Sequence, residues 1–304
     1  MSEFGWAVVG PGKIANRFAD AVGQIPGARL AGIHGRDSKR AEVFARAWCK
    51  PDGTSAPVFG NLEALLGSDA VDAVYIATPH AFHADAIRRC LLAGKPVLCE
   101  KPMVANARLA GELVDLSRQR GVFLMEALWT RFLPIYATVR DWLGSNAIGE
   151  LRGMQSSFCF NAPFNSGSRL FDPAQAGGSL LDLGIYNLAM TQWVLQAAHG
   201  ACPEPVSINA TGLLGPTGVD HRVAASLEDV ATLGQLIEVE MPLQTREDVL
   251  WLLPAAIRTF QNRTFVVIQT PDGERVMDVE LGLQTDDQIE ILSGVQEGDV
   301  VVGP

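Results

Sequence analysis

Short apolar runs alternate with amphipathic segments along the first 125 residues of the chain. The runs are nearly continuous, which is typical of strands buried on both faces of a parallel sheet. Between them, apolar residues recur at the spacing of one helix face. The predicted strands cover residues 4–9, 29–34, 73–77, 96–99 and 122–125, the last of which is counted as a sixth strand. One predicted helix begins at residue 14, and the others cover residues 62–66, 83–93 and 107–121. This alternation predicts a doubly wound parallel Rossmann sheet over residues 1–125.

A glycine-rich turn joins the first predicted strand to the first helix. Residues 10–15 read Gly-Pro-Gly-Lys-Ile-Ala, which is the pattern GxGxxA. Gly10 and Gly12 let the backbone approach a pyrophosphate, and the helix terminus at Lys13 and Ile14 offers free N–H groups and a positive dipole. The pattern alone is weak evidence, but its place between a strand and a helix predicts a dinucleotide site.

The end of the second strand bears on the choice of cofactor. NAD-specific sites usually carry an acid there for the ribose hydroxyls, and in this chain the position is Gly35. Arg36 and Ser38 can instead hold a 2′-phosphate through charge-assisted hydrogen bonds. Asp37 keeps NAD open as the less favoured cofactor, and the basic residues could also be an exposed helix turn. We predict NADP.

Charged and polar residues follow two further strands, at the sheet edge where parallel sheets bind ligands. Glu100-Lys101-Pro102 ends one buried run, and Pro102 restrains Lys101 at the sheet edge. Thr78-Pro79-His80 ends the preceding strand and faces the same crevice. His80 and His83 are expected to touch cofactor or substrate, although capping or packing would explain them equally well. The predicted cofactor contacts of this region are Thr78, Pro79, His80, His83, Glu100 and Lys101.

The pattern changes after residue 125. Residues 126–134 lead into an amphipathic helix that ends near Gly144, and residues 149–161 alternate as a strand does. A helix is then predicted from the glycine pair Gly177-Gly178 to about residue 196. Asp182 and Tyr186 are four residues apart on it and share one face. A capping aspartate beside a half-buried tyrosine is an equally good interpretation.

These motifs together resemble the glucose-fructose oxidoreductase and inositol dehydrogenase (Gfo/Idh/MocA) family, over about residues 4–227. The motifs are residues 10–15, Thr78-Pro79, residues 100–102, residues 126–129 and residues 177–186. The resemblance implies a Rossmann domain followed by an α/β domain whose open sheet often forms a homodimer. It also implies that Lys101 takes part in catalysis, while Asp182 and Tyr186 line the substrate pocket. Tyr186, where many members carry histidine, points to the dimeric dihydrodiol dehydrogenase and xylose dehydrogenase branch.

The implied chemistry is hydride transfer between NADP(H) and a carbinol or carbonyl carbon of a sugar, polyol or trans-dihydrodiol. The hydroxyl proton needs an acceptor. Tyr186 can accept it if Lys101 lowers its pKa, and Asp182 can orient the hydroxyl. Trp129, Arg131 and Arg169 are the further substrate residues expected, the arginines binding polar groups.

The carboxyl-terminal part departs from this family. Residues 126–228 are expected to form only a partial substrate domain, and residues 229–304 resemble the β region of periplasmic adaptor (membrane fusion) subunits of efflux transporters. Strands at 264–269 and 275–281 flank Pro271-Asp272-Gly273, a hairpin signal. We therefore expect a truncated oxidoreductase fused to a mostly β adaptor fragment. The alternative function is an adaptor or interaction protein with a passive Rossmann half.

Charge and cysteine content narrow the function classes. The formal charge of −10 and pI near 5.0 argue against nucleic-acid and anionic-membrane partners. The sequence shows no basic stretch leading into an apolar run, which predicts a cytoplasmic protein. Five scattered cysteines without CxxC spacing suit reduced thiols, and His80 with His83 lacks further ligands at metal spacing, so no metal site is expected.

Overall fold

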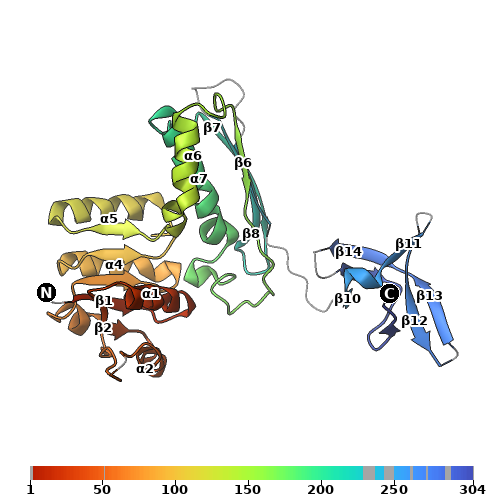
Figure 1. Ribbon diagram of the computed structural model, residues 1–304, viewed down its shortest axis with the longest axis horizontal. Helices are drawn as coiled ribbons and strands as arrows, with labels where there is room; N and C mark the ends of the chain where they lie inside the picture. The colour runs from red at the N-terminus through yellow and green to blue at the C-terminus, as the bar shows by residue number, and fades with distance from the viewer. Residues whose placement is uncertain are drawn as a thin grey trace. The chain divides into compact units, whose positions relative to one another are not determined.

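The computed structural model describes residues 3–50, 52–228, 237–242, 250–260, 263–271, 273–284 and 289–303. The chain divides into two compact units (Figure 1). The first comprises Met1–Asn161 and Asn165–Gln244, and the second comprises Ala162–Phe164 and Thr245–Pro304. Each unit is described by itself.

Five parallel strands form the first sheet, in the order β2-β1-β3-β4-β5. They are β1 (Phe4–Val9), β2 (Ala28–His34), β3 (Ala73–Ile76), β4 (Val97–Cys99) and β5 (Leu124–Glu126). The predicted doubly wound sheet is confirmed, but the count of six strands is wrong. Among the described residues between β2 and β3, only Val58 pairs, in a single parallel bridge to Ile33. Pro57 before it lacks an N–H group and Gly60 soon follows, so this segment does not extend into a strand.

Helices connect these strands, four of them close to the predicted positions and one, at residues 38–47, where none was predicted. They are α1 (Lys13–Gln24), α2 (Ser38–Ala47), α3 (Leu62–Leu66), the short η1 (His80–Phe82), α4 (His83–Leu92) and α5 (Ala107–Arg120). The side chain of Asn106 accepts a hydrogen bond from the backbone N of Leu109 and caps α5. At its other end Gly121 has φ +64°, a conformation that glycine adopts without strain.

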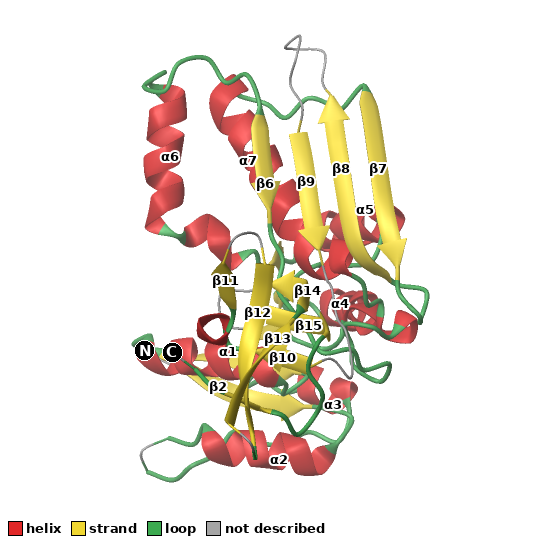
Figure 2. Cartoon of the chain, turned by 90° about the vertical axis from the view of Figure 1, so that its right-hand side faces the viewer, coloured by secondary structure: helices red, strands yellow, loops and turns green. Residues whose placement is uncertain are grey.

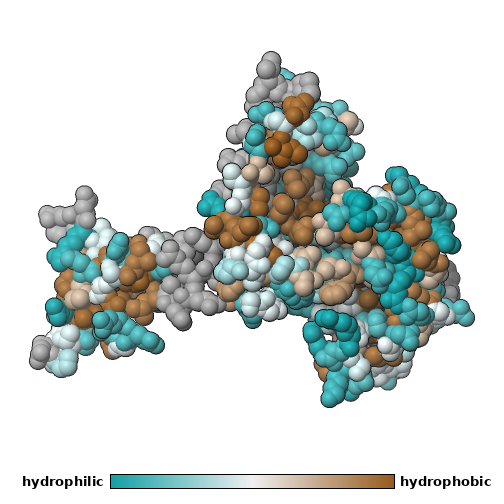
Figure 3. Space-filling model, turned by 180° about the vertical axis from the view of Figure 1, so that it is seen from behind, coloured by the Kyte–Doolittle hydropathy of each residue, from teal (hydrophilic) through white to brown (hydrophobic). Residues whose placement is uncertain are grey.

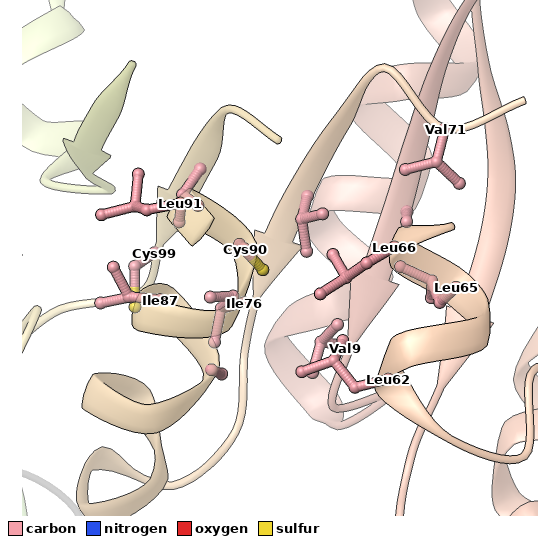
Figure 4. Packing of buried hydrophobic residues seen from close by; sticks show 14 of the residues in the cluster. Val9, Leu62, Leu65, Leu66, Val71, Ile76, Ile87, Cys90, Leu91 and Cys99 are labelled. Carbon is pink, nitrogen blue, oxygen red and sulfur yellow. The ribbon is translucent and has the colours of Figure 1, made fainter. Parts of the chain in front are cut away.

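The two faces of the sheet carry separate hydrophobic cores, because successive residues of a strand point to opposite faces. Val8, Ile33 and Tyr75 pack with α1 and α2 on one face. On the other face Ala7 and Val9 pack with α3, α4 and α5, and Figure 4 shows Ile76, Ile87 and Leu91 in this cluster. Burial on both faces explains why the strands read as continuous apolar runs.

A second sheet of four strands follows, in the order β6-β9-β8-β7 (Figure 2). The strands are β6 (Met154–Ser157), β7 (Ser207–Leu214), β8 (Asp220–Glu228) and β9 (Ile237–Pro242). β9 pairs antiparallel with β8 and parallel with β6. The sheet therefore extends beyond residue 228, where the sequence pattern placed the end of this domain, because β9 provides the pairing partner of β6.

Several helices accompany this second sheet. They are the short η2 (Trp129–Phe132), α6 (Pro134–Gly144), the short η3 (Pro173–Gln175), the π-helical turn η4 (Leu180–Gly184) and α7 (Ile185–His199). Of these, α7 packs against β6 and β9, and η4 packs against β8 and β9. Asn187 of α7 donates a hydrogen bond to Ser156 Oγ of β6 at 2.9 Å, and Tyr136 of α6 packs on Trp193. Three hydrophobic residues of β7 are exposed, namely Ile208, Leu213 and Leu214. Figure 3 shows that hydrophobic residues also lie among the polar ones on the surface seen from behind.

The second unit is built mainly of short strands. One sheet has the strand order β10 (Leu250–Leu252), β15 (Ile289–Ser293) and β14 (Glu280–Gln284). The other sheet contains β11 (Arg258–Phe260), β12 (Arg263–Thr270), β13 (Gly273–Asp278) and β16 (Val300–Val301). The short helix η5 (Pro254–Ala256) lies between β10 and β11 in the chain. β12 and β13 pair antiparallel, as the hairpin signal predicted. The mostly β character is confirmed, whereas the resemblance to efflux adaptors stays a prediction. In the part of the chain that the structure describes, no helix is long and apolar enough to cross a membrane.

Candidate active site

The glycine loop after β1 has the geometry of a phosphate cradle. Gly10 has φ +90°, and a Cβ atom there would lie 2.7 Å from the backbone N of Thr78, so a side chain does not fit. A Cβ atom on Gly12 would meet nothing within 4 Å. No side chain caps α1 and no acid occupies its first turn, which leaves the N–H groups at Lys13 and Ile14 free for an anion. The loop fits a dinucleotide pyrophosphate.

The residues after β2 form the adenosine end of this candidate site. A Cβ atom on Gly35 would lie 2.8 Å from Cδ of Pro11, so an acidic side chain does not fit there without a shift. Asp37 accepts a hydrogen bond from the backbone N of Arg40 and caps α2, in which Ser38 is the first residue. The Arg36 guanidinium lies over the ring of Phe82, 5.2 Å from its centroid. In the sheet, β1, which leads into the glycine loop, lies between β2 and β3.

The residues at the ends of β3 and β4 are tied together. Thr78 Oγ1 is buried and makes no hydrogen bond with any described residue, so it can bond to a ligand, and Pro79 follows it before η1. The ring nitrogens of His83, which is fully buried, lie 2.7 Å from the Thr78 carbonyl oxygen and 2.9 Å from that of Pro102. The Glu100 carboxylate accepts a hydrogen bond from Tyr75 Oη at 2.5 Å. Thr78, His83 and Glu100 thus hold the two strand ends in register.

Lys101 lies just after the carboxyl end of β4, at the sheet edge where the sequence predicted it, and contacts Asp182 and Tyr186. Its side chain is only 12% exposed. The ammonium donates to the Asp182 carbonyl oxygen at 2.5 Å and to Asp182 Oδ1 at 3.1 Å, and it lies 4.8 Å from the centroid of the Tyr186 ring. An ammonium has three N–H donors, and no other described residue accepts the third. That donor is available to a substrate oxygen.

The Asp182 carboxylate is contacted by two positively charged side chains, Lys101 and Arg169. Arg169 donates to Asp182 Oδ1 at 3.0 Å, and His80 Nε2 lies 3.7 Å from the same oxygen. Burial alone would raise the pKa of Asp182, but Lys101 and Arg169 outweigh it and hold the pKa below its ordinary value. The carboxylate is therefore ionised at neutral pH.

His80 is the uncharged member of this group. Its Nδ1 lies 3.0 Å from the carbonyl oxygen of Ala176, which only accepts, so Nδ1 carries the proton and Nε2 faces Asp182 with a lone pair. Burial lowers the pKa of His80 to about 4. The imidazole is neutral at pH 7 and adds no charge to the site.

Tyr186 has aromatic neighbours and an unexpected proton affinity. Trp129 Nε1 donates to Tyr186 Oη at 3.2 Å, and the Phe158 ring packs edge-on at 5.3 Å. Burial raises the pKa of Tyr186, against the expectation that Lys101 lowers it. The negative charges of Glu100 and Asp182 raise this pKa further. Phe158 was not predicted as a site residue, since its alternating pattern indicated only a core position.

The glycine pair before η4 explains how this segment reaches Lys101. A Cβ atom on Gly177 would lie 2.7 Å from the carbonyl oxygens of Arg169 and Leu170, so the backbone passes too close for any side chain. Gly178 has φ +117° and donates its backbone N–H to Leu170 at 2.9 Å. The loop that carries Arg169 is thereby packed against the turn that carries Asp182.

Arg131 has a different position from the other predicted substrate residues. It lines a cavity of about 660 Å³, together with Leu128, Ile185 and Leu188. Lys101, Asp182, Tyr186, Trp129 and Arg169 do not line that cavity. The structure thus brings five of the predicted catalytic and substrate residues together and places Arg131 beside them, in a separate cavity.

Comparisons with known proteins identify the family to which both parts of this chain are similar. A family model described as an oxidoreductase family with an NAD-binding Rossmann fold (GFO_IDH_MocA) matches residues 4–128, and the GFO/IDH/MocA C-terminal domain matches residues 136–236. Trans-1,2-dihydrobenzene-1,2-diol dehydrogenase of Mus musculus is 39% identical over 225 residues, which cover 73% of this chain and 64% of that protein. The Xenopus laevis protein of the same name is 33% identical over 246 residues, with 79% and 71% covered.

Solved structures show the same architecture. KijD10, a 3-ketoreductase from Actinomadura kijaniata in complex with NADP and TDP-benzene, is 26% identical with a TM-score of 0.68, covering 91% of this chain and 84% of that one. The chain spans about 64% of the length of several mammalian dihydrodiol dehydrogenases that it matches. The two family models match in order along the chain, first the NAD(P)-binding Rossmann domain and then the α/β domain that follows it. This chain therefore belongs to the GFO/IDH/MocA oxidoreductase family.

Proposed function

We propose that this protein is an NADP(H)-dependent oxidoreductase acting on a carbinol or carbonyl carbon of a sugar, a polyol or a trans-dihydrodiol. One observation carries the proposal: the largely buried Lys101 ammonium lies between Asp182 and the Tyr186 ring, at the same edge of the parallel sheet as the glycine loop. The relatives named as dihydrodiol dehydrogenases and the ketoreductase bound to NADP support this substrate class. A homodimer, which the resemblance of the sequence motifs implies, stays a prediction.

The protein's own groups handle the proton. When bound, NADP(H) supplies or accepts the hydride. The Tyr186 hydroxyl accepts a hydrogen bond from Trp129, and no described residue accepts its own proton, so that proton can go to a carbonyl oxygen. The third N–H of Lys101 can stabilise the negative charge on the same oxygen. Because burial raises the pKa of Tyr186, the phenol is protonated at neutral pH and suits carbonyl reduction best.

The proposed preference for NADP rests on Arg36. Gly35 leaves no acid to repel a 2′-phosphate, Asp37 is engaged as a helix cap, and the Phe82 ring supports the Arg36 guanidinium. Arginine binds phosphate through paired N–H donors, which suits this position. Ser38, at the first turn of α2, can add a hydroxyl donor.

Titration of the full chain with NADPH and NADH tests the cofactor. We expect Arg36→Ala to weaken NADPH binding by about 1–3 kcal/mol, the usual loss for a hydrogen bond to a charged group, and to leave NADH binding nearly unchanged. Arg46→Ala, which removes an arginine from the last turn of α2, is the matched control. An equal loss for both cofactors would contradict the role of Arg36, and no binding at all would favour a passive Rossmann half.

A substrate screen tests the chemistry. Diols, aldoses and their ketones are assayed by the absorbance of the reduced nicotinamide. We expect Lys101→Ala and Tyr186→Phe each to lower turnover by about two to four orders of magnitude, as for general acid–base groups, while NADPH still binds the tyrosine variant. Full turnover of Tyr186→Phe would move the proton-transfer role elsewhere, first to His80.

A further inference from the structure

We propose that Asp220 is a positioning residue that fixes the turn carrying Asp182 and, through it, the Lys101 ammonium. The inference rests on the proposed function for the role of Lys101. Asp220 begins β8 and lies 38 residues after Asp182 in the chain. No motif singled it out in the sequence.

The contacts of Asp220 are with the start of η4. Its Oδ2 accepts a hydrogen bond from Ser179 Oγ at 2.8 Å and another from the backbone N of Leu180 at 2.6 Å. Ser179 is fully buried. The first N–H groups of a helical segment have no partner within it, and a carboxylate both satisfies them and complements their partial positive charge. Asp220 therefore fixes the first residue of the turn from outside.

Two residues further on, the same turn supplies both acceptors of Lys101. The Asp182 carbonyl oxygen and Oδ1 lie 2.5 and 3.1 Å from the ammonium, so any rotation of the turn moves both. π-helical turns are rare and occur mostly at functional sites. Here the π-helical turn runs directly into α7, which carries Tyr186. Asp220 thus acts on the site through the backbone and does not touch Lys101 itself.

Local features of β8 and its surroundings direct Asp220 toward η4. Along a regular strand, Asp220 and His221 would point to opposite faces of the sheet. The pairing of β8 with β7 is irregular at this point, because Leu213 pairs with Arg222 and Leu214 with Asp220, so that the register skips His221. Such a β-bulge changes the direction in which the neighbouring side chains point. His221 packs on the fully buried Phe171, 5.0 Å between ring centroids, while Asp220 reaches Ser179.

Gly178 completes this packing. A Cβ atom on Gly178 would clash with Asp220 Oδ1, so the carboxylate occupies the space that the glycine leaves open. Gly178 and Asp220, 42 residues apart in the chain, therefore pack directly against each other. Its effect is to hold the catalytic turn at a fixed distance from β4.

The experiment compares full-length variants by amine labelling and by turnover. An amine-reactive ester is added, and peptide mass spectrometry gives the labelling rate of Lys101 relative to Lys95, whose ammonium bonds to the carbonyls of Ser68 and Val71. In Asp220→Ala we expect the relative labelling of Lys101 to rise several-fold. We also expect kcat to fall about 10- to 100-fold, as for a misplacement of about 1 Å, with NADPH affinity unchanged.

Two further variants separate geometry from charge and from general stability. Asp220→Asn keeps an oxygen acceptor for Leu180, so it should restore labelling and kcat to within about threefold of the parent. Glu228→Ala is the matched control, because this carboxylate lies on the same strand and also accepts from a serine, Ser207 Oγ at 2.9 Å. It should change neither the labelling ratio nor kcat.

The outcomes are distinguishable. An unchanged Lys101 labelling ratio in Asp220→Ala overturns the inference even if stability falls. Should Asp220→Ala not fold, Ser179→Ala removes one of the two hydrogen bonds, and the labelling ratio must rise there instead. Absent turnover in the parent chain counts against the proposed function alone, because the labelling ratio does not depend on catalysis.

Discussion

Two cations converge on the Asp182 carboxylate, and a neutral histidine completes its surroundings. Lys101 and Arg169 keep the acid ionised, whereas burial keeps His80 uncharged. A buried ion pair is weak evidence for stability, but the removal of one partner leaves the other charge unpaired. These residues therefore make the site sensitive to pH, and the direction follows from their pKa values.

His80 is expected to make the protein less stable in mild acid. Its pKa is about 4 in the folded chain and about 6.5 when unfolded, so between these values only the unfolded chain binds the proton. The contribution of neutral His80 to the free energy of unfolding is fully present above pH ~6.5 and is lost as the pH falls toward ~4. At pH ~4.5 the loss is about 2–3 kcal/mol, and Asp182 acts in the same direction at still lower pH.

Thermal unfolding of His80→Gln from about pH 7 to 4.5 checks this expectation. The variant should lose less stability than the parent chain over that range. His199→Gln is the control, because His199 is an exposed residue at the end of α7. Identical pH profiles for the parent and His80→Gln would show that the folded protein protonates His80 without cost.

At the scale of elements, the turn before α7 depends on glycine for conformation and for space. Gly178 combines φ +117° with the close approach of Asp220, and neither suits an L side chain. Gly111 offers the opposite case, an exposed glycine inside α5 with nothing within 4 Å of a Cβ atom. The two positions allow the same substitution to be compared with opposite expectations.

Gly178→Ala should destabilise the chain by more than about 1 kcal/mol and lower turnover, because the backbone and Asp220 must both move. Gly111→Ala should stabilise it by about 0.5–1 kcal/mol, since alanine loses less entropy in a helix. Unfolding midpoints and kcat measured side by side give the answer. Equal effects at the two positions would mean that the turn has no special backbone requirement.

At the scale of the molecule, β9 connects the two halves of the second sheet. It lies between β6 and β8, so its loss would leave two strand edges unpaired. All the candidate cofactor and catalytic residues lie in the unit that ends at Gln244. The sheet, rather than the tail, should therefore decide whether the site survives shortening of the chain.

Two shortened chains test this point. Residues 1–244 should bind NADPH like the full chain, whereas residues 1–228 should unfold at lower temperature and lose turnover, because β6 has no pairing partner left. NADPH titration and thermal unfolding are the measurements. Equal stability of both would show that β9 contributes nothing to the sheet.

Local periodicity was enough to predict the Rossmann sheet. Strands that are buried on both faces consist of continuous apolar runs, which can be recognised in the sequence. The turn at Gly10, the helix cap at Asn106 and the helix end at Gly121 each depend on only a few neighbouring residues. The place of Lys101 followed as well, because parallel strands present their carboxyl ends at one edge. The hairpin of β12 and β13 was predicted on the same local grounds.

Contacts between distant segments were decided only by the tertiary structure. Lys101 and Asp182 meet across 81 positions, and Asp220 reaches Leu180 across 40, distances that no periodicity spans. The raised pKa of Tyr186 depends chiefly on its burial and also on the nearby charges of Glu100 and Asp182. β9 could not be assigned to the second sheet from its own residues, because strand pairing depends on which edges the rest of the fold leaves open.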